Sequence, residues 1–321
     1  MGAPMTPPAG VTVEALAPGF GDVVECHGPA QLKDLEPEWV AERFHKRGCL
    51  AFRGFGAGVG DFEAFTAALG GDFMTYQGGG LRFGPLDRRA ITPDRTVLSA
   101  TGSTQEFPVP MHGEMYYMGR PPEIIWFFCA TPPAAGGETT VADGRAIPDA
   151  LAPATRRLLT DHRLRFARDM ADGEWQTAFL TADQAVVEQV CAENRTSCQW
   201  GADGSLRTVF ECPAIIEHPT RGQVFINTIL PVAFGELAVG QSTVPGLTRI
   251  TMTVRLDDGR QIPADALENM HKVSNRAAVP VGWRTGDLLM VDNTWVLHGR
   301  RASEGTGREI FVRMCRFKHA A

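Results

Sequence analysis

The chain has 321 residues, of which 44% are hydrophobic and 21% are charged, so it can bury a core and is not compositionally disordered. Its 35 glycines and 22 prolines exceed the usual share and argue against a helix bundle or coiled coil, because they predict many turns. The net charge of −6, without a long run of Lys or Arg, argues against nucleic acid as a partner.

The cysteines and the hydropathy pattern predict a soluble cytoplasmic protein. Seven cysteines are scattered without a C-x-x-C pair, which suits neither a disulfide framework nor a thiolate zinc site. No apolar stretch reaches the roughly 18 residues of a membrane span, and no secretion signal is recognisable. We therefore expect buried thiols in a reducing compartment and no membrane partner.

The first part of the chain predicts a helix, a strand and a second helix. Residues 36–48 have an early proline, an apolar side and a final glycine, which are typical of a helix with a defined end. The apolar segment 49–52 follows as a strand. The second helix is predicted to begin with Asp61 as its N-cap and to run to Leu69.

The rest of the chain alternates between sequence patterns typical of strands and patterns typical of helices. Short apolar runs separated by turn residues predict the first half of a β core at 96–145, with a buried strand at 124–129. Residues 147–200 are predicted to be helical, with a capping box at Thr181-x-x-Gln184. Further elements follow: strands near 207–229, a helix at 263–273, and strands at 288–291, 295–298 and 309–317.

The length is compatible with two domains or with one, but neither an internal repeat nor a low-complexity linker divides the chain. We therefore expect a single domain over residues 1–321. Its β core would be interrupted by a long insertion at about 147–280.

His112 and Glu114 form the first candidate metal site. On an extended backbone, side chains two positions apart point to the same side, and the intervening glycine leaves room for both. An imidazole and a carboxylate could then bind one metal ion. The pattern H-x-[DE] is expected about once by chance in a chain of this composition, so alone it decides nothing.

His298 strengthens this site, because it ends an apolar β segment near the other end of the chain. Two histidines and one carboxylate on neighbouring strands form a facial triad, which leaves three positions of an octahedral ion open and is typical of non-haem Fe(II) oxygenases. A keto acid that chelates such an ion needs a fixed cation for its far carboxylate, and a guanidinium provides one bidentately. Arg308, Arg313 and Arg316 follow His298 as candidates.

Several motifs stand in order along nearly the whole chain: Gly48-Cys-Leu-Ala-Phe-Arg-Gly-Phe55, Met111-His-Gly-Glu-Met-Tyr-Tyr117, Gly136-Gly-Glu-Thr-Thr-Val-Ala-Asp143, Asp292-Asn293, His298-Gly-Arg-Arg301 and Arg308-Glu-Ile-Phe-Val312. Together they resemble the TauD/TfdA family of iron- and 2-oxoglutarate-dependent oxygenases, especially its clavaminate-synthase-like and syringomycin-pathway-like branch. The resemblance implies a mainly β fold with flanking helices (α+β): a double-stranded β-helix, or jelly roll, with a long lid insertion.

The resemblance implies that His112, Glu114 and His298 bind Fe(II). Most of the family has Asp at the second position, whereas Glu is similar to the clavaminate synthase branch. Related halogenases replace this carboxylate with a small residue to admit a halide, so Glu114 argues against halogenation.

The resemblance also implies the binding site of the co-substrate 2-oxoglutarate, with O2 as the second co-substrate. Thr139 and Arg308 match the residues that bind its far carboxylate. The position four residues after Arg308, which often binds an anionic substrate in relatives, is Val312 here. Arg313 is the alternative cofactor-binding arginine, although its opposite strand parity predicts that it points away from the site.

Six residues are candidate substrate contacts: Gln105, Met111, Tyr116, Tyr117, Trp200 and Asn227. The first four flank the predicted metal strand, and Asn227 matches a position that faces the site in relatives. For the tyrosines, a place in the core is an equal alternative. Trp200 would either stack on a ligand or anchor the lid.

The resemblance implies an enzyme that hydroxylates an unactivated C–H bond of a small amino acid or amino-acid-derived intermediate in natural-product biosynthesis, such as that of an antibiotic. The substrate would be free or tethered to a carrier protein, and the same oxidant could instead desaturate or cyclise it. A zinc hydrolase and a non-catalytic jelly-roll binding protein remain as alternatives from other classes. A homo-oligomer is compatible with the sequence.

Overall fold

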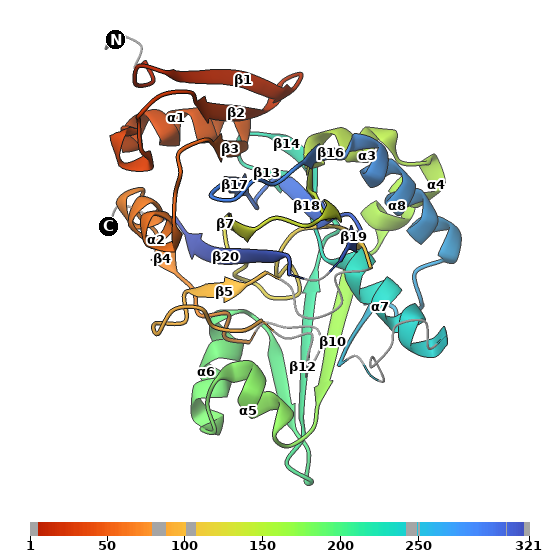
Figure 1. Cartoon of the computed structure of the whole chain (residues 1–321). Helices are drawn as coiled ribbons and strands as arrows, with labels where there is room; N and C mark the ends of the chain where they lie inside the picture. Colours follow the sequence, from red (N-terminus) through yellow and green to blue (C-terminus); the bar gives the residue numbers. More distant parts are fainter. Residues whose placement is uncertain are drawn as a thin grey trace.

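The computed structural model describes residues 6–78, 88–100, 107–241, 249, 251–305 and 307–317. Its largest sheet has the strand order β1-β2-β3-β17-β7-β20-β4, and β5 pairs with the free part of β20 (Figure 1). The strands are β1 (Val11–Ala17), β2 (Phe20–Cys26), β3 (Cys49–Arg53), β4 (Asp72–Phe73), β5 (Val97–Ser99), β7 (Ile124–Thr131), β17 (Leu288–Asp292) and β20 (Glu309–Arg316).

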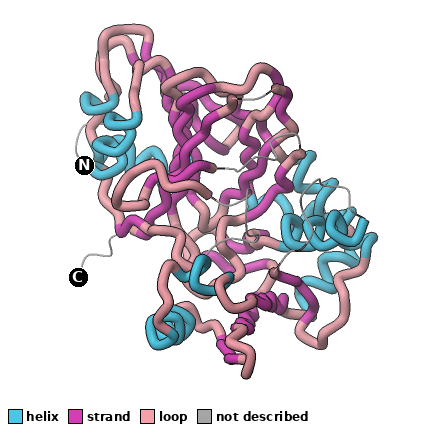
Figure 2. Tube along the Cα trace, turned by 60° about the horizontal axis from the view of Figure 1, so that its bottom comes forward, coloured by secondary structure: helices cyan, strands magenta, loops and turns pink. Residues whose placement is uncertain are grey.

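A second, four-stranded sheet has the order β16-β9-β18-β6 and completes the jelly roll. Its strands are β6 (Val109–His112), β9 (Thr139–Asp143), β16 (Val279–Val281) and β18 (Val296–Arg300). The short strand β8 (Ala135–Gly136) follows β7 in the chain, and β19 (Ser303–Glu304) follows β18. These two short strands pair with each other. Figure 2 shows the helices around the outside of this strand-rich centre.

The central strands of the large sheet are buried on both faces. Along β7, Ile125 and Phe127 belong to the core shared with the smaller sheet, whereas Trp126 and Phe128 belong to a second core under two helices. These helices are α1 (Pro37–Arg47), which follows the 3-10 turn η1 (Leu32–Asp34), and α2 (Val59–Ala68). This double burial explains why the strand at 124–129 is a continuous apolar run without polar alternation.

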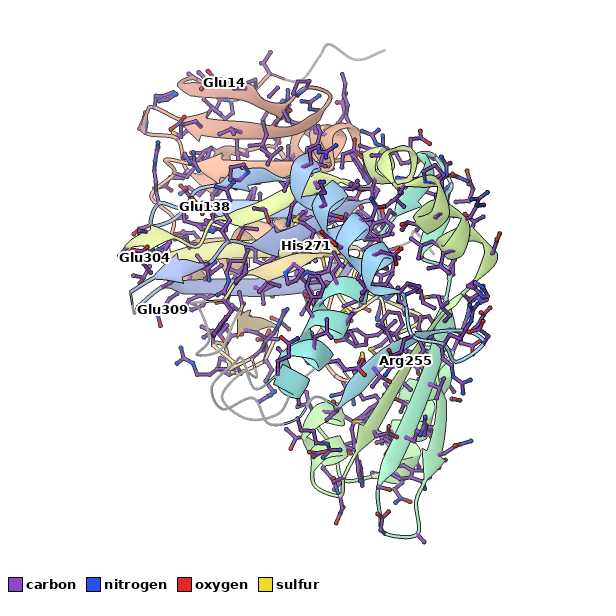
Figure 3. The ribbon with its side chains drawn as sticks, turned by 90° about the vertical axis from the view of Figure 1, so that its right-hand side faces the viewer. Glu14, Glu138, Arg255, His271, Glu304 and Glu309 are labelled. Atoms are coloured by element: carbon purple, nitrogen blue, oxygen red, sulfur yellow. The ribbon has the colours of Figure 1, made fainter. Side chains whose placement is uncertain are left out.

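A long segment leaves the smaller sheet at Asp143 and returns at Val279 on the neighbouring strand β16. It contains a four-stranded sheet, β11-β12-β10-β15, which we call the lid sheet, and a hairpin of β13 with β14. Figures 1 and 3 show β10 and β12 projecting below the sandwich, and Figure 3 labels Arg255 of β15, which binds Glu236 of α7 at 2.8 Å.

The elements of this segment are η2 (Gly144–Ala146), α3 (Ile147–Ala150), α4 (Pro153–Asp161), β10 (Leu164–Met170), α5 (Glu174–Phe179), α6 (Gln184–Glu193), β11 (Ser197–Trp200), β12 (Leu206–Cys212), β13 (Ile215–His218), β14 (Gly222–Phe225), α7 (Ile229–Gln241), β15 (Met252–Leu256) and α8 (Ala264–Ala277). Within the described ranges, no helix has both the length and the apolar character needed to cross a membrane.

Most predicted elements are confirmed, including α1, β3, β7, α8 and the three C-terminal strands. The continuous helical region at 147–200 was wrong, because β10 and β11 lie within it. The pattern of β10, with buried Leu164 and Phe166 around a half-buried arginine, is that of a strand with one covered face. The strands β1, β2 and β15 and the apolar helix α7 were missed.

Two predicted helix starts were also wrong. α2 begins at Val59, and Asp61 lies inside its first turn, where its carboxylate accepts a hydrogen bond from the Gly58 amide at 2.9 Å. α6 is capped by Asp183, whose side chain accepts from the Ala185 amide at 2.9 Å, and not by Thr181. In α2 the predicted residue Asp61 caps from inside the first turn, and in α6 the neighbouring Asp183 takes the place of the predicted Thr181.

The end of α1 supplies a test of how closely its last turn fits the core. Gly48 has a φ of 71°, and a Cβ at this position would collide with the Trp295 indole. We expect Gly48→Ala to lower the free energy of unfolding by about 2–4 kcal/mol, from backbone strain plus overpacking. Gly19→Ala is the matched control, because Gly19 has a φ of 73° but nothing within 4 Å of the added Cβ. Equal losses in denaturant titrations of both variants would contradict this account.

Candidate metal centre

The two predicted histidine ligands face each other across neighbouring strands. His112 of β6 is the cross-strand partner of His298 of β18, and their ring centroids are 4.3 Å apart. Glu114 lies just after β6, and its Oε2 is 3.7 Å from Nε2 of His298 and 4.0 Å from Nε2 of His112. Since one ligand atom from each residue lies within 4.8 Å of the other two, the set fits a single metal ion.

The His112 imidazole is in a suitable state to bind a metal. Burial, and then the neighbouring His298, lower the pKa of His112 to about 3, so this ring is neutral at pH 7. Its Nδ1 lies 2.8 Å from the Pro110 carbonyl, which accepts a hydrogen bond from the Nδ1–H group and leaves the lone pair of Nε2 for a metal ion. Nδ1 of His298 is buried and, among the described residues, has no hydrogen-bond partner.

The backbone at Glu114 is held from both sides. Asn293 accepts a hydrogen bond from the Glu114 amide at 2.8 Å, and its own amide donates to the Glu114 carbonyl at 3.1 Å. Gly113 permits this turn, because a Cβ there would lie 2.6 Å from the Tyr116 ring. The next residue, Met115, has a φ of 60°, a strained value for a side chain of this size. Asn293 is therefore a positioning residue whose role the sequence alone did not reveal.

The Glu114 carboxylate has two further partners that sequence reasoning missed. Arg88 donates to Oε2 at 2.7 Å, and the Tyr76 hydroxyl donates to Oε1 at 3.3 Å. Burial alone would raise the pKa of Glu114, but the Arg88 guanidinium and the two imidazoles outweigh it and hold this pKa well below its usual range. The carboxylate is therefore ionised, as a metal ligand requires.

A basic wall, formed by Thr139 and Arg300 of the smaller sheet and by Arg308 just before β20, adjoins the triad. Thr139 pairs with Arg300 across β9 and β18, and Arg308 donates to the Gly137 carbonyl at 3.3 Å. Burial and the nearby Arg300 lower the pKa of Arg308 to about 10, so the guanidinium remains charged at pH 7. The Thr139 hydroxyl accepts from the Trp283 indole at 3.2 Å. This arrangement of one hydroxyl and two buried guanidinium groups fits a carboxylate.

Arg300 was not among the predicted site residues, although the signal was present. It lies two positions after His298 on the same strand, so strand parity places both side chains on one face. Parity also predicted that Arg313 points away, and the structure agrees. The Arg313 guanidinium binds Thr66 at 2.6 Å and stacks on Phe73, on the side covered by α2. The structure therefore places Arg313 away from the basic wall, on the other side of the sheet.

Three of the predicted substrate contacts use their side chains in hydrogen bonds within the protein. Met111 is on the opposite face of β6 from His112, and its Sδ accepts from the Thr140 hydroxyl at 3.1 Å. The Tyr116 hydroxyl donates to the Asn293 carbonyl at 2.9 Å. Asn227 donates to the Ala214 carbonyl at 3.1 Å and accepts from the amide of Ile229, at the start of α7.

The other three predicted substrate contacts lie in different parts of the chain and have different surroundings. The Trp200 indole donates to Glu188 of α6 at 2.9 Å and packs edge-on against Trp175, so it anchors the helices of the lid. Tyr117 is buried, and it lines a cavity between the metal loop and the lid sheet. Gln105 lies outside the described residues.

Comparisons with known proteins agree with this geometry. The family model "Taurine catabolism dioxygenase TauD, TfdA family" matches residues 12–315. A clavaminate synthase-like protein of Arabidopsis thaliana is 25% identical over 296 residues, which are 88% of this chain and 85% of that protein. The dapdiamide synthesis protein DdaC of Enterobacter agglomerans is 27% identical over 282 residues, covering 83% and 82%.

Solved structures share the fold. PvcB of Pseudomonas aeruginosa superposes with a TM-score of 0.58 at 16% identity, covering 98% of this chain and 94% of its own. A second PvcB structure is described as an Fe, alpha-ketoglutarate dependent oxygenase from an isonitrile synthetic pathway. A taurine dioxygenase of Burkholderia xenovorans gives a TM-score of 0.55 at 15% identity, covering 95% and 89%.

The family match spans nearly the whole chain, the jelly roll is that of its structural neighbours, and the His112–Glu114–His298 set fits ferrous iron. The chain therefore belongs to the TauD/TfdA family and is a non-haem iron dioxygenase that depends on 2-oxoglutarate.

Proposed function

We propose that this dioxygenase hydroxylates an unactivated C–H bond of a small amino acid or of an amino-acid-derived intermediate in natural-product biosynthesis. The observation that carries the proposal is the position of the triad, which lies on the same inner face as the basic wall. Two relatives support the substrate class: DdaC acts in dapdiamide synthesis, and PvcB belongs to an isonitrile pathway.

Each part of the site has a separate task in this proposal. His112, Glu114 and His298 hold the iron on one face and leave its other face open. Thr139 and Arg308 bind the far carboxylate of 2-oxoglutarate, with Arg300 adding a second positive charge beside it. Iron, 2-oxoglutarate and O2 together supply an oxidant that can attack an unactivated C–H bond.

The surroundings of the triad keep water away from this chemistry. His298 is 5% exposed, Glu114 is 4% exposed, and the Phe127 ring lies 5.5 Å from the His298 ring. A dry, apolar environment strengthens the charge interactions of the bound groups and protects a reactive oxidant from solvent. The strands β6 and β18 fix the two histidines, and Asn293 fixes the turn that carries Glu114, so the site is pre-organised.

The position of the substrate relative to the oxidant decides which reaction occurs. The same oxidant would desaturate or cyclise a substrate whose carbon is held slightly further away. A zinc hydrolase would use the same three ligands with an activated water, but the basic wall would then have no task. We place the enzyme in the cytoplasm and in a pathway such as antibiotic biosynthesis, with a free or carrier-bound substrate.

The first prediction separates the oxygenase from the zinc hydrolase and from a non-catalytic binding protein. We expect slow O2-dependent release of succinate from 2-oxoglutarate with Fe(II), even without substrate, and none with Zn(II). His298→Ala should abolish it by removing an iron ligand.

The matched control is His271→Ala, because His271 lies on the outer helix α8, packs against Phe234 and is outside the triad (Figure 3). This variant should retain the unaltered rate. Succinate release that survives His298→Ala, or that proceeds equally with Zn(II), would refute the proposal.

The second prediction compares Arg308, which directly precedes β20, with Arg313 within β20. Arg308→Gln should raise the KM for 2-oxoglutarate at least about 30-fold, because a buried carboxylate loses its charged partner. Arg313→Gln should leave this KM within about twofold and lower only the thermal stability, because Arg313 binds Thr66 and Thr96 on the other side of the sheet. Steady-state kinetics at saturating Fe(II) measure both, and a larger KM effect at position 313 would reverse the assignment.

A further inference from the structure

A buried threonine from a distant segment lies inside the turn that carries the metal ligand Glu114. The Thr228 hydroxyl donates to the Gly113 carbonyl at 2.8 Å and accepts a hydrogen bond from the Tyr116 amide at 3.1 Å. In a tight turn, the carbonyl of the first residue and the amide of the fourth often bind each other directly. Here the hydroxyl joins these two groups, so a side chain from outside the turn closes it.

The segment that contains Thr228 is itself held by the fold. Thr228 lies between β14 and α7 and is 2% exposed. The carbonyl of the preceding residue, Asn227, accepts from the Gly113 amide at 2.8 Å. The Asn227 side chain donates to the Ala214 carbonyl and accepts from the Ile229 amide, both at 3.1 Å. The position of the Thr228 hydroxyl is therefore fixed independently of the turn.

The turn needs support from outside because its backbone is strained. Met115, which follows the metal ligand, has a φ of 60°, and a side chain of this size adopts such a value only where surrounding contacts impose it. Asn293 binds the amide and the carbonyl of Glu114 on one side, and Thr228 binds two backbone groups on the other. Loss of the hydroxyl would leave both groups without a partner and release one side of the turn.

We propose that Thr228 is a positioning residue of the metal centre, which sets the place of Glu114 through the backbone of its turn. Arg88 and Tyr76 hold the carboxylate end of this ligand, whereas Thr228 and Asn293 hold its backbone end. A glutamate has one more rotatable bond than an aspartate, so it loses more conformational freedom when it binds a metal ion. Because both ends are held beforehand, the affinity of the site for Fe(II) depends on the Thr228 hydroxyl.

The alternative is a purely structural role, in which Thr228 only stabilises the fold. Both roles predict that removal of the hydroxyl lowers the stability, because buried backbone groups lose a hydrogen-bond partner. Only the positioning role predicts that the folded variant also binds metal more weakly. The test therefore measures metal affinity and stability separately.

The experiment measures the binding of Fe(II), and of Co(II) as a spectroscopic stand-in, to the metal-free full chain by anaerobic competition with a chelator. Thr228→Val keeps the shape of the side chain and removes the hydroxyl. We expect its affinity for both ions to fall about 10- to 100-fold, as for other contacts that orient a metal ligand. The visible bands of bound Co(II) should also change. Thr228→Ser keeps the hydroxyl and should bind both ions within about threefold of the unaltered protein.

Thr66→Val is the matched control. Thr66 of α2 is fully buried, and its hydroxyl likewise donates to one group, the Phe62 carbonyl at 2.9 Å, and accepts from another, the Arg313 guanidinium at 2.6 Å. It lies on the face of the large sheet that is opposite the metal centre. We expect this variant to unfold at a lower temperature and to keep the Fe(II) affinity of the unaltered protein.

A double variant shows whether Thr228 acts through Glu114. In Glu114→Ala, the two histidines remain as ligands and should still bind Co(II) weakly. Addition of Thr228→Val should then cause no further loss of affinity, because the ligand that the hydroxyl positions is already absent. A further loss as large as that in the single variant would assign the hydroxyl to the fold as a whole and overturn the proposal.

Three other results would also overturn it: an Fe(II) affinity of Thr228→Val within about twofold of the unaltered protein, an equal loss in Thr228→Ser, or an equal loss in Thr66→Val. If Thr228→Val fails to fold, Thr228→Ala replaces it, because it lacks the hydroxyl and places no second methyl group against the turn. Metal affinity is measured without substrate, so these results do not depend on the proposed reaction. Failure of the unaltered protein to bind Fe(II) would refute the iron site itself.

Discussion

The contact between His112 and His298 is the constraint on which the rest of the structure depends. These residues are 186 positions apart in the chain, yet they are direct partners across β6 and β18. A single ion can bind both only if everything between them returns to the same sheet. The long segment that leaves at Asp143 and returns at Val279 does so, because the two strands at its ends, β9 and β16, are neighbours.

Buried arginines mark where negative charge is held around this contact. Arg88 holds the Glu114 carboxylate in its ionised form. Arg300 and Arg308 lie buried next to Thr139 and Gly137. A guanidinium is costly to bury without an opposite charge, so a buried arginine indicates where a negative charge is bound. Arg88 thus balances the charge of a metal ligand, and we propose that Arg300 and Arg308 balance the far carboxylate of 2-oxoglutarate.

Much of this arrangement could be predicted from the sequence. The metal triad follows from one short-range pair and one distant histidine, and strand parity separated Arg308 from Arg313. The predicted strand at 124–129 is confirmed because it is buried on both faces, which leaves an unmistakable apolar run. Long motifs in fixed order also identified the family before any geometry was known.

The rest of the site could not be predicted from the sequence, because it depends on contacts between segments that are distant in the chain. Asn293, Arg88 and Tyr76 act on Glu114 only because the fold brings three separate segments together, and no local pattern signals this. The strand β10 was mistaken for helix because its covered face includes an arginine, which hides the alternation that a strand normally shows. Met111 and Asn227 were assigned to substrate from their neighbours, whereas their own side chains are used within the core.

The most direct test of the central claim is anaerobic addition of Fe(II) and then 2-oxoglutarate to the metal-free protein, followed by visible absorption spectroscopy. The account predicts a metal-to-ligand charge-transfer band that needs both additions, because the open face of the His112–Glu114–His298 site leaves room for a chelating keto acid. Absence of the band at saturating Fe(II) and 2-oxoglutarate would contradict the account.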